Sequence, residues 1–173
     1  MGEHELIFAH FFFVDIVGLS DPKTAAAAQI KKLNFLNQCI SQSKAFRSVS
    51  RKDKVVLPTG DGMAIAFLRG AELPLELAIE LNIKIRKYNV GKLGVDSIDV
   101  RIGIHSGSCF LLKDLNKNDN VWGPGIILAR RCFEIADGVS GYSSAIDPLH
   151  VEADIANGKG TCVVEFVAGI SQA

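Results

Sequence analysis

Apolar positions recur along the chain with two different spacings, and each spacing predicts its own kind of element. Segment 5–16 is apolar on both faces, which is typical of a strand at the centre of a sheet. In segments 23–40 and 73–88 the apolar residues return every three or four positions, which predicts two amphipathic helices. Asp21-Pro22, just before the first of these helices, is a helix start signal.

Shorter apolar runs, separated by polar or glycine-containing turns, predict the remaining elements. We expect strands at 45–50, 54–59, 63–69, 98–105, 108–113, 141–146 and 161–167. We expect two further helices at 125–135 and 151–156, a charged turn at 51–53 and a loop at 114–120.

The connections between these runs indicate the fold. Strands 54–59 and 63–69 are joined through Gly60-Asp61-Gly62 as a hairpin, and strand 108–113 is expected to be the hairpin partner of strand 98–105. The resulting order, β-α-β-β-α-β with further elements after it, is the split β-α-β plan. We therefore expect one α+β domain over residues 1–173, with a ferredoxin-like, antiparallel-rich sheet and helices packed on one face.

Composition narrows the class of protein. The chain has 173 residues, of which 48% are hydrophobic and 22% charged, so it is long and apolar enough to bury a sizeable core. The formal net charge is zero and there is no basic stripe, which argues against a general nucleic-acid-binding protein. The apolar run 6–19 contains His10 and Asp15 and is too short to span a membrane. It also lacks the features of a signal peptide, so we expect a cytoplasmic protein without membrane association.

The cysteines are widely scattered and form no Cys-x-x-Cys pair. A zinc site is therefore not expected, and in a cytoplasmic chain these residues behave as small buried hydrophobes. They are Cys39, Cys109, Cys132 and Cys162.

Two acidic residues interrupt the apolar strand runs, each close to glycine. Asp15 ends the first run and is followed by Gly18, and Asp61 lies between Gly60 and Gly62. Taken singly, the first is typical of a turn or helix cap and the second of a hairpin turn. A carboxylate in an apolar run is costly to bury without a partner, and glycine lets the backbone approach a ligand closely. Together they predict a shared cation and a loop for a metal-bound phosphate chain.

Four motifs occur in the order that they have in class III nucleotidyl cyclases. Phe13-Val14-Asp15-Ile16-Val17-Gly18-Leu19-Ser20 resembles that family's Phe-x-Asp-Ile-x-Gly-Phe-Thr, and Thr59-Gly60-Asp61-Gly62-Met63 resembles its Gly-Asp hairpin. Arg101-Ile102-Gly103-Ile104-His105-Ser106-Gly107 is similar to its Arg-x-Gly-Ile-His-x-Gly strand and turn. The segment from Val121-Trp122-Gly123 to Arg131 is similar to the start of its third helix. Each motif is weak alone, but four in order are strong support for the family.

The resemblance implies a ferredoxin-like catalytic core that works as a head-to-tail homodimer, with an active site at each interface. Asp15 and Asp61 match the two aspartates that bind two divalent ions, Mn²⁺ or Mg²⁺, and the carbonyl of Ile16 is implied to complete the metal shell. One ion activates the ribose 3′-hydroxyl of a nucleoside triphosphate for in-line attack on the α-phosphorus. The other ion neutralises the leaving pyrophosphate.

The resemblance also assigns the residues that hold the phosphates. The amides of Val17, Gly18, Leu19 and Ser20 are implied to bind the triphosphate. Arg131 matches an arginine that reaches the phosphates across the dimer, a role that suits its planar fork; the plain alternative is a solvated helix face beside Arg130. We expect His105 to be a structural hydrogen-bonding residue and Lys159 to be a hairpin-turn lysine.

Three positions depart from the family pattern, and they concern the base and the sugar. Leu57 stands where adenylate and guanylate cyclases carry a Lys or Glu that reads the purine edge. Asn120 aligns with a second purine reader, and Ile127 aligns with the helix Asn that steadies ribose and phosphate. A leucine leaves the polar purine edge unpaired, which costs binding of that base.

These departures leave three interpretations. The protein is a non-catalytic module of the same fold for nucleotide sensing or dimerisation, an adenylate or guanylate cyclase, or a cyclase that reads another base. We favour the last. A domain that had lost its activity would be expected to retain the metal-binding carboxylates no better than the base-reading residues, yet both carboxylates are present. The altered purine readers, the run from Leu57 to Met63 and the standalone domain resemble the bacterial pyrimidine cyclases of anti-phage signalling (the Pycsar type).

The Pycsar resemblance implies UTP or CTP as substrate and a cyclic nucleotide that activates a separate effector protein. We predict UTP and cyclic UMP, with CTP as the next candidate. Asn120 pairs with either pyrimidine edge by flipping its amide, so the choice between the two bases stays open on this residue.

Overall fold

The computed structural model describes residues 5–138, 150–154 and 161–165. At its centre is β1 (Glu5–Ile16), which pairs antiparallel with β3 (Gly62–Phe67) on one side and with β4 (Val100–Lys113) on the other. β2 (Lys54–Pro58) pairs with β3, so these strands lie in the order β2-β3-β1-β4. This order confirms the split β-α-β plan and the antiparallel sheet that the sequence predicts.

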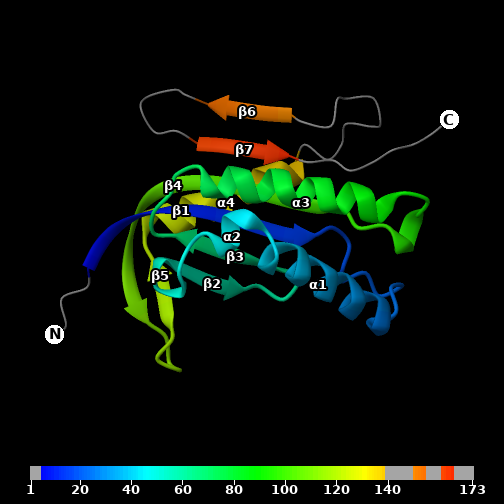
Figure 1. Cartoon of the computed structure of the whole chain (residues 1–173), viewed down its shortest axis with the longest axis horizontal. Helices are drawn as coiled ribbons and strands as arrows, with labels where there is room; N and C mark the ends of the chain where they lie inside the picture. The colour runs from blue at the N-terminus through cyan, green and yellow to red at the C-terminus, as the bar shows by residue number, and fades with distance from the viewer. Residues whose placement is uncertain (1–4, 139–149, 155–160, 166–173) are drawn as a thin grey trace.

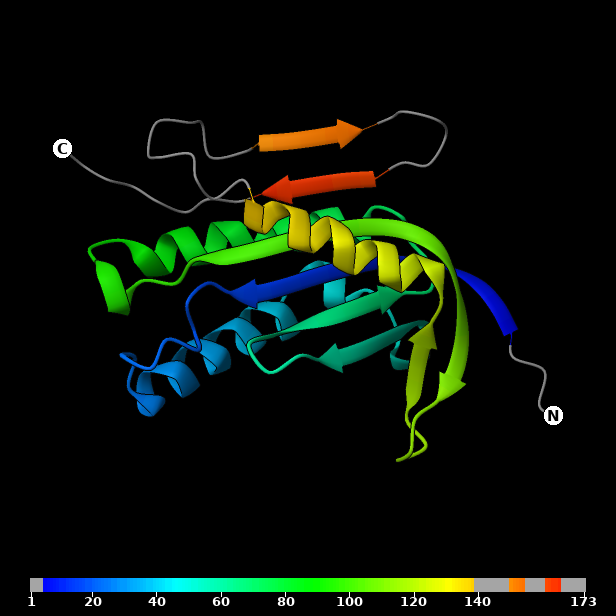
Figure 2. The same cartoon turned by 180° about the vertical axis from the view of Figure 1, so that it is seen from behind.

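Three further strands extend the sheet from β4. β7 (Thr161–Glu165) pairs with the middle of β4, and β6 (His150–Asp154) pairs with β7. β5 (Asp119–Trp122) pairs instead with the C-terminal end of β4. Figure 2 shows that β4 bends strongly past β1 and leads into β5, which therefore lies away from β6 and β7.

Helices cover both faces of the sheet (Figures 1 and 2). α1 (Ala26–Ser41), α2 (Lys44–Arg47) and α3 (Leu73–Asn89) lie on one face, and α4 (Pro124–Gly138) lies on the other. The prediction that the helices pack on one face is therefore wrong for α4.

β1 provides the physical reason for this two-sided cover. Phe12 and Val14 belong to a buried cluster that includes residues of α1 and α3. Phe11 and Phe13 belong to a second buried cluster, which includes Ala129 of α4. Because successive side chains of a strand point to opposite faces, a strand that is apolar at consecutive positions needs apolar cover on both.

Other predicted elements are confirmed to within a few residues. α1 and α3 cover the two amphipathic segments, and the charged turn is a 3₁₀ turn, η1 (Arg51–Asp53). A second 3₁₀ turn, η2 (Gly94–Asp96), precedes β4. The buried stripe of α3 contains Leu77, Leu81 and Ile85, as the helical spacing predicts.

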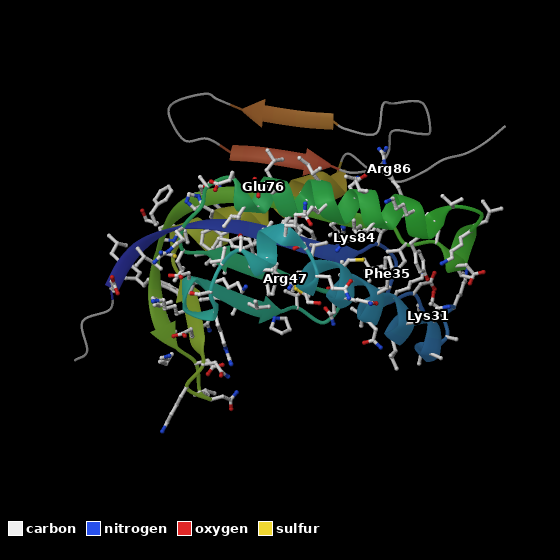
Figure 3. All side chains as sticks on the ribbon, in the orientation of Figure 1. Lys31, Phe35, Arg47, Glu76, Lys84 and Arg86 are labelled. Carbon is white, nitrogen blue, oxygen red and sulfur yellow. The ribbon has the colours of Figure 1, made fainter. Side chains whose placement is uncertain are left out.

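The junction of α1 and α3 is held by a ring contact and by a hydrogen bond between the helices. The rings of Phe35 and Tyr88 lie 4.2 Å apart, and Nζ of Lys84 donates to the carbonyl of Cys39 at 2.8 Å. Figure 3 shows Phe35, Lys84 and Lys31 on this face. Two shallow hollows of about 450 and 400 Å³ lie here, and no predicted site residue lines either of them.

The strand predicted at 45–50 is wrong, because α2 and a turn occupy this segment. Ser43 caps α2, its Oγ accepting a hydrogen bond from the amide of Phe46 at 3.1 Å. The carboxylate of Glu80 in α3 accepts from the amides of Lys44 and Ala45 at 2.9 and 3.1 Å. These bonds satisfy the free amides of the helix start, and one of the partners comes from a distant part of the chain.

The hairpin predicted between 98–105 and 108–113 is also wrong, because β4 runs through both segments without a turn. β1 pairs with β4 from Glu5 opposite Leu111 to Ile16 opposite Val100, and this long partner keeps β4 continuous. Gly107 lies inside the strand, where a Cβ would be 2.9 Å from Cα of Gly125 in α4. The glycine that suggests a turn therefore serves the approach of a helix.

The C-terminal predictions have mixed outcomes. The helix predicted at 151–156 is wrong where the structure describes it, since residues 150–154 form β6. Pairing with β7 outweighs the local helical pattern there. The last strand is confirmed over residues 161–165. The strand predicted at 141–146 and the turn at Lys159 lie outside the described residues.

Candidate active site

The fold brings the two predicted metal ligands, Asp15 and Asp61, to the same corner of the sheet. Asp15 is opposite Gly62 in the β1–β3 pairing, and the amide of Ile16 donates to the carbonyl of Asp61 at 3.1 Å. Asp61 occupies the hairpin between β2 and β3, and its side chain is half-buried. Two carboxylates that are 46 positions apart in the sequence therefore lie on adjoining segments.

The hairpin itself follows from its glycines. The amide of Thr59 donates to the carbonyl of Gly62 at 3.1 Å, which leaves Gly60 and Asp61 as the two central residues of the turn. Gly60 has a φ of 97°, and a positive φ at the first central position is the feature of a type II′ hairpin turn.

Gly62 is required for a different reason, the close approach of β3 to β1. A Cβ on this residue would lie 1.9 Å from the carbonyl oxygen of Val14 and 2.6 Å from Cα of Asp15. No side chain fits at that distance. The glycine after Asp61 is therefore what allows the hairpin to lie directly beside Asp15.

Asp15 is buried and forms an ion pair with Arg101, its partner across the β1–β4 ladder. Nε of Arg101 donates to Oδ1 at 3.1 Å, and Nη2 donates to Oδ2 at 2.7 Å. The guanidinium also lies 5.3 Å from the ring centre of Phe133 in α4. Arg101 begins the Arg-x-Gly-Ile-His-x-Gly-like motif, but its role at Asp15 was not predicted from the sequence. The signal for one was available, because a carboxylate in a buried strand needs a partner and Arg101 is the basic residue of segment 98–105.

The predicted phosphate loop is a tight turn after β1. Gly18 has a φ of 66°, and the buried side chain of Leu19 anchors the turn in the core. The amide of Val17 donates to the carbonyl of Asp99 at 2.9 Å, and that of Leu19 donates to the carbonyl of Ile16 at 3.3 Å. Two of the four amides predicted to bind phosphate are thus engaged within the chain. The other two belong to Gly18 and Ser20, whose residues are exposed.

The predicted base-reading positions lie on β2 and β5, two strands that contact each other. Leu57 is half-buried in β2, against the cluster on the α4 face. Asn120 is half-buried in β5, and its Oδ1 accepts from the amide of Val121 at 2.8 Å. Asn120 is opposite Leu112 of β4, eleven residues beyond Arg101 in that strand.

The two predicted positions on α4 point away from the sheet. Ile127 is 45% exposed, and Arg131, one turn further along the helix, is exposed as well. Ala129 and Phe133, on the other side of the helix, pack against the sheet. This placement fits both interpretations of Arg131, a contact with a second copy of the chain or a solvated helix face.

His105 lies beneath α4, on the same face of β4 as Arg101 and Gly103. Burial lowers the pKa of this imidazole below its ordinary value. Among the described residues, Nδ1 of His105 has no hydrogen-bond partner. The prediction that His105 is a structural hydrogen-bonding residue is therefore wrong at this nitrogen as far as the described part of the chain is concerned. A Cβ on Gly103 would be 2.7 Å from Cβ of Phe133, so α4 packs closely over this strand.

The cysteines behave as predicted where their side chains are described. Cys39 and Cys109 are both free thiols in the buried core. Burial raises the pKa of each thiol, which keeps it protonated.

The donor set at the corner suits a hard divalent cation. Asp15, Asp61 and the carbonyl of Ile16 supply oxygen atoms, which Mg²⁺ and Mn²⁺ prefer. Within the described residues, no three His, Cys, Asp or Glu side chains form a cluster that could hold a metal. Both carboxylate oxygens of Asp15 are engaged by Arg101. The residues present therefore fit such an ion, provided that Arg101 gives up part of its contact.

Comparison with known proteins places the fold. The sequence matches no protein-family model and no curated protein. A bacterial light-regulated adenylyl cyclase matches with a TM-score of 0.63 and 14% identity, over 95% of this chain and 53% of its own length. The adenylyl cyclase CyaB from P. aeruginosa matches with a TM-score of 0.59 and 14% identity, over 99% and 98% of the two chains. The chain has the fold of a nucleotidyl cyclase catalytic domain.

Another solved cyclase domain supports the same fold. The catalytic core of a rhodopsin-guanylyl cyclase with converted specificity, in complex with ATPαS, matches with a TM-score of 0.59 and 19% identity, over 96% of this chain and all of its own. The chain spans about half the length of the light-regulated adenylyl cyclase. The resemblance to class III cyclases is thus confirmed at the level of the cyclase fold. No helix in the described part of the chain is both long and apolar enough to cross a membrane.

Proposed function

We propose that this protein is a nucleotidyl cyclase that converts UTP to 3′,5′-cyclic UMP and pyrophosphate. The observation that carries the proposal is the placement of Asp15 beside the Asp61 hairpin, on a fold shared with adenylyl and guanylyl cyclases. Both carboxylates are held there by backbone pairing. Only glycine fits at position 62, because a Cβ there would clash with the backbone of β1.

The proposed chemistry needs little from the protein beyond positioning and charge. Asp15, Asp61 and the carbonyl of Ile16 would hold two Mg²⁺ or Mn²⁺ ions, and such ions would supply activation of a ribose hydroxyl and neutralisation of pyrophosphate. The amides of residues 17–20 donate to the triphosphate. Since those of Val17 and Leu19 are bonded within the chain, substrate binding requires this turn to open. The ribose 3′-hydroxyl would lose its proton to solvent water as its oxygen attacks the α-phosphorus in line, and the bond from the α-phosphorus to the bridging oxygen of pyrophosphate would break.

The proposed active unit is a head-to-tail homodimer. Asn120 pairs near the C-terminal end of β4 and Asp15 pairs near its start, which separates them by about 36 Å of strand. Residues near Asn120 carry exposed apolar surface, with Trp122 61% and Ile127 45% exposed. A second copy covering this surface would bring Asn120 and Arg131 of one protomer toward the Asp15 of the other.

The choice of UTP rests on the base-reading positions. Leu57 offers no donor or acceptor, so a purine edge placed there loses hydrogen bonds at about 1–3 kcal/mol for each unpaired group. A pyrimidine presents fewer polar atoms, and Asn120 is able to pair with them by either end of its amide. We propose that cyclic UMP serves as a second messenger in bacterial antiviral defence, where it activates a separate effector protein.

An adenylyl or guanylyl cyclase is the second candidate, and the solved cyclases that share the fold favour it. A non-catalytic module is the third, and the ion pair that occupies Asp15 favours it. One experiment separates the three: the purified protein is incubated with each of the four ribonucleoside triphosphates and Mn²⁺, and the products are identified by mass. Cyclic UMP supports the proposal, cyclic AMP or GMP supports the second candidate, and no turnover supports the third.

A further inference from the structure

Arg101 occupies the carboxylate that the proposed function assigns to a metal. Its Nε and Nη2 atoms donate hydrogen bonds to the two carboxylate oxygens of Asp15, at 3.1 and 2.7 Å. Only 7% of the Asp15 side chain and 21% of the Arg101 side chain are exposed. Solvent therefore screens this pair far less than it screens an ion pair on the surface.

Backbone register and packing fix the position of Arg101. Asp15 is directly opposite Arg101, and the ladder continues on both sides, with Val14 opposite Ile102 and Ile16 opposite Val100. The ring of Phe133 lies 5.3 Å from the guanidinium carbon, an attractive cation–π distance. The backbone of Arg101 is therefore fixed opposite Asp15 by β4, and its guanidinium packs between Asp15 and Phe133 of α4.

A divalent cation at Asp15 would meet this fixed positive charge. The fork of Arg101 uses lone pairs that a metal ion requires, and the two cations repel each other at short range. Asp61 adds a negative charge on the adjoining hairpin, which favours the metal. Loading the site is thus an exchange of one cation for another at Asp15.

We propose that Arg101 is an internal counter-ion that competes with the divalent cation for Asp15 and so sets the cation concentration at which the site loads. This inference rests on the proposed function in taking Asp15 as a metal ligand. Arg101 acts through Asp15 and is a positioning residue. In the absence of metal it neutralises a buried carboxylate, and it releases at least one oxygen of Asp15 when the metal binds.

The test measures Mn²⁺ binding without nucleotide, from the electron paramagnetic resonance signal of the free ion. Arg101→Gln should bind Mn²⁺ about tenfold more tightly than the natural chain, or tighter still, because the competing charge is gone. Arg101→Lys keeps a charge but loses the fork, so its affinity should lie between the two. Arg69→Gln is the matched control: it removes the 2.7 Å ion pair with Asp53, in which Arg69 is 71% exposed, and should leave Mn²⁺ affinity unchanged.

Thermal unfolding with and without Mn²⁺ gives a second readout. Without metal, Arg101→Gln should unfold at a lower temperature than the natural chain, because Asp15 is then buried without its counter-ion. Saturating Mn²⁺ should raise its unfolding temperature by more than that of the natural chain, and Asp15→Asn should abolish this rise. If Arg101→Gln does not fold without metal, the comparison is made with Arg101→Lys.

Two results would overturn the inference. One is a folded Arg101→Gln or Arg101→Lys protein that binds Mn²⁺ no more tightly than the natural chain. The other is the absence of Asp15-dependent Mn²⁺ binding in every variant. Because no nucleotide is present, a failure to make cyclic UMP contradicts the proposed function and leaves this result standing.

Discussion

Asp15 and Arg101 face each other across β1 and β4 and form a two-pronged ion pair, with 2.7 Å between Oδ2 and Nη2. The pair explains how an acidic residue is buried near the end of the apolar central strand β1. It also means that a change at Asp15 affects stability as well as chemistry, which distinguishes this residue from Asp61.

Replacing either carboxylate should abolish turnover, but with different effects on the free energy of unfolding. Asp15→Ala removes the carboxylate with which the guanidinium of Arg101 forms its buried ion pair, and we expect a loss of about 3 kcal/mol. Asp61→Ala changes a half-buried hairpin residue and should cost less than about 1 kcal/mol. Urea unfolding of the two variants checks the difference, and equal losses would contradict this account of Asp15.

Gly62→Ala should destabilise the protein by about 3 kcal/mol or more, because its Cβ would lie 1.9 Å from the carbonyl oxygen of Val14. Gly91→Ala is a suitable control. Gly91 has a φ of 73° and nothing within 4 Å of an added Cβ, so it should lose only about 1–2 kcal/mol of left-handed strain. A Gly62→Ala protein as stable as the control would show that β1 and β3 are further apart than in this structure.

Mixing two inactive variants should restore activity if the site is shared between protomers. Asp61→Ala and Arg131→Ala are expected to be inactive or strongly impaired when measured singly. In a mixed head-to-tail dimer, one interface has an intact Asp61 from one chain and an intact Arg131 from the other, so part of the turnover should return. No recovery in well-folded mixed dimers would argue for Arg131 as a solvated residue of α4.

Stability should fall as the pH is lowered through the titration of His105, which is buried, and of His10, which is half-buried. Burial lowers the pKa of His105 and of His10, with the charge of Glu72 opposing the effect at His10. A histidine with a depressed pKa contributes its full stability above the unfolded pKa of about 6.5 and loses it as the pH falls toward the folded pKa. His105→Gln should therefore flatten the dependence of unfolding free energy on pH below the unfolded pKa of about 6.5. An unchanged slope would exclude His105 as its source.

Leu57→Lys should lower the turnover of UTP. The change places a charge where the half-buried leucine packs against the cluster on the α4 face, and it introduces the kind of side chain that the resemblance to adenylate and guanylate cyclases implies for reading a purine. Rates with UTP and with ATP, compared between the variant and the natural chain, check this. A variant that keeps the full UTP rate would remove Leu57 from the base-reading site.

The local sequence pattern was sufficient to predict the elements whose apolar residues follow one regular spacing. β1, the Gly60–Asp61 hairpin and the buried stripe of α3 follow from apolar spacing and glycine positions alone. The misplaced elements depend on distant partners. α2 forms because Glu80 satisfies its first amides, and β4 runs through Gly107 because β1 pairs along its length and Gly125 needs the space.

In the candidate site too, some residues could be predicted from local sequence pattern and others only from contacts between distant segments. The sequence singles out Asp15 and Asp61 as acids beside glycine, and the structure brings them together. The role of Arg101 depends on the register of two strands that are more than eighty residues apart in sequence. The residue could be suspected from the cost of burying Asp15, but its position opposite that carboxylate needed the fold.

We propose that cyclisation takes place at the corner formed by Asp15 and Asp61. The most direct test of this proposal incubates the protein with UTP and Mn²⁺ and quantifies cyclic UMP and pyrophosphate together, with Asp61→Ala as the control. We predict equal amounts of the two products from the natural chain and neither from the variant. Linear UMP, the same products from Asp61→Ala, or faster formation of cyclic AMP or cyclic GMP from ATP or GTP would contradict it.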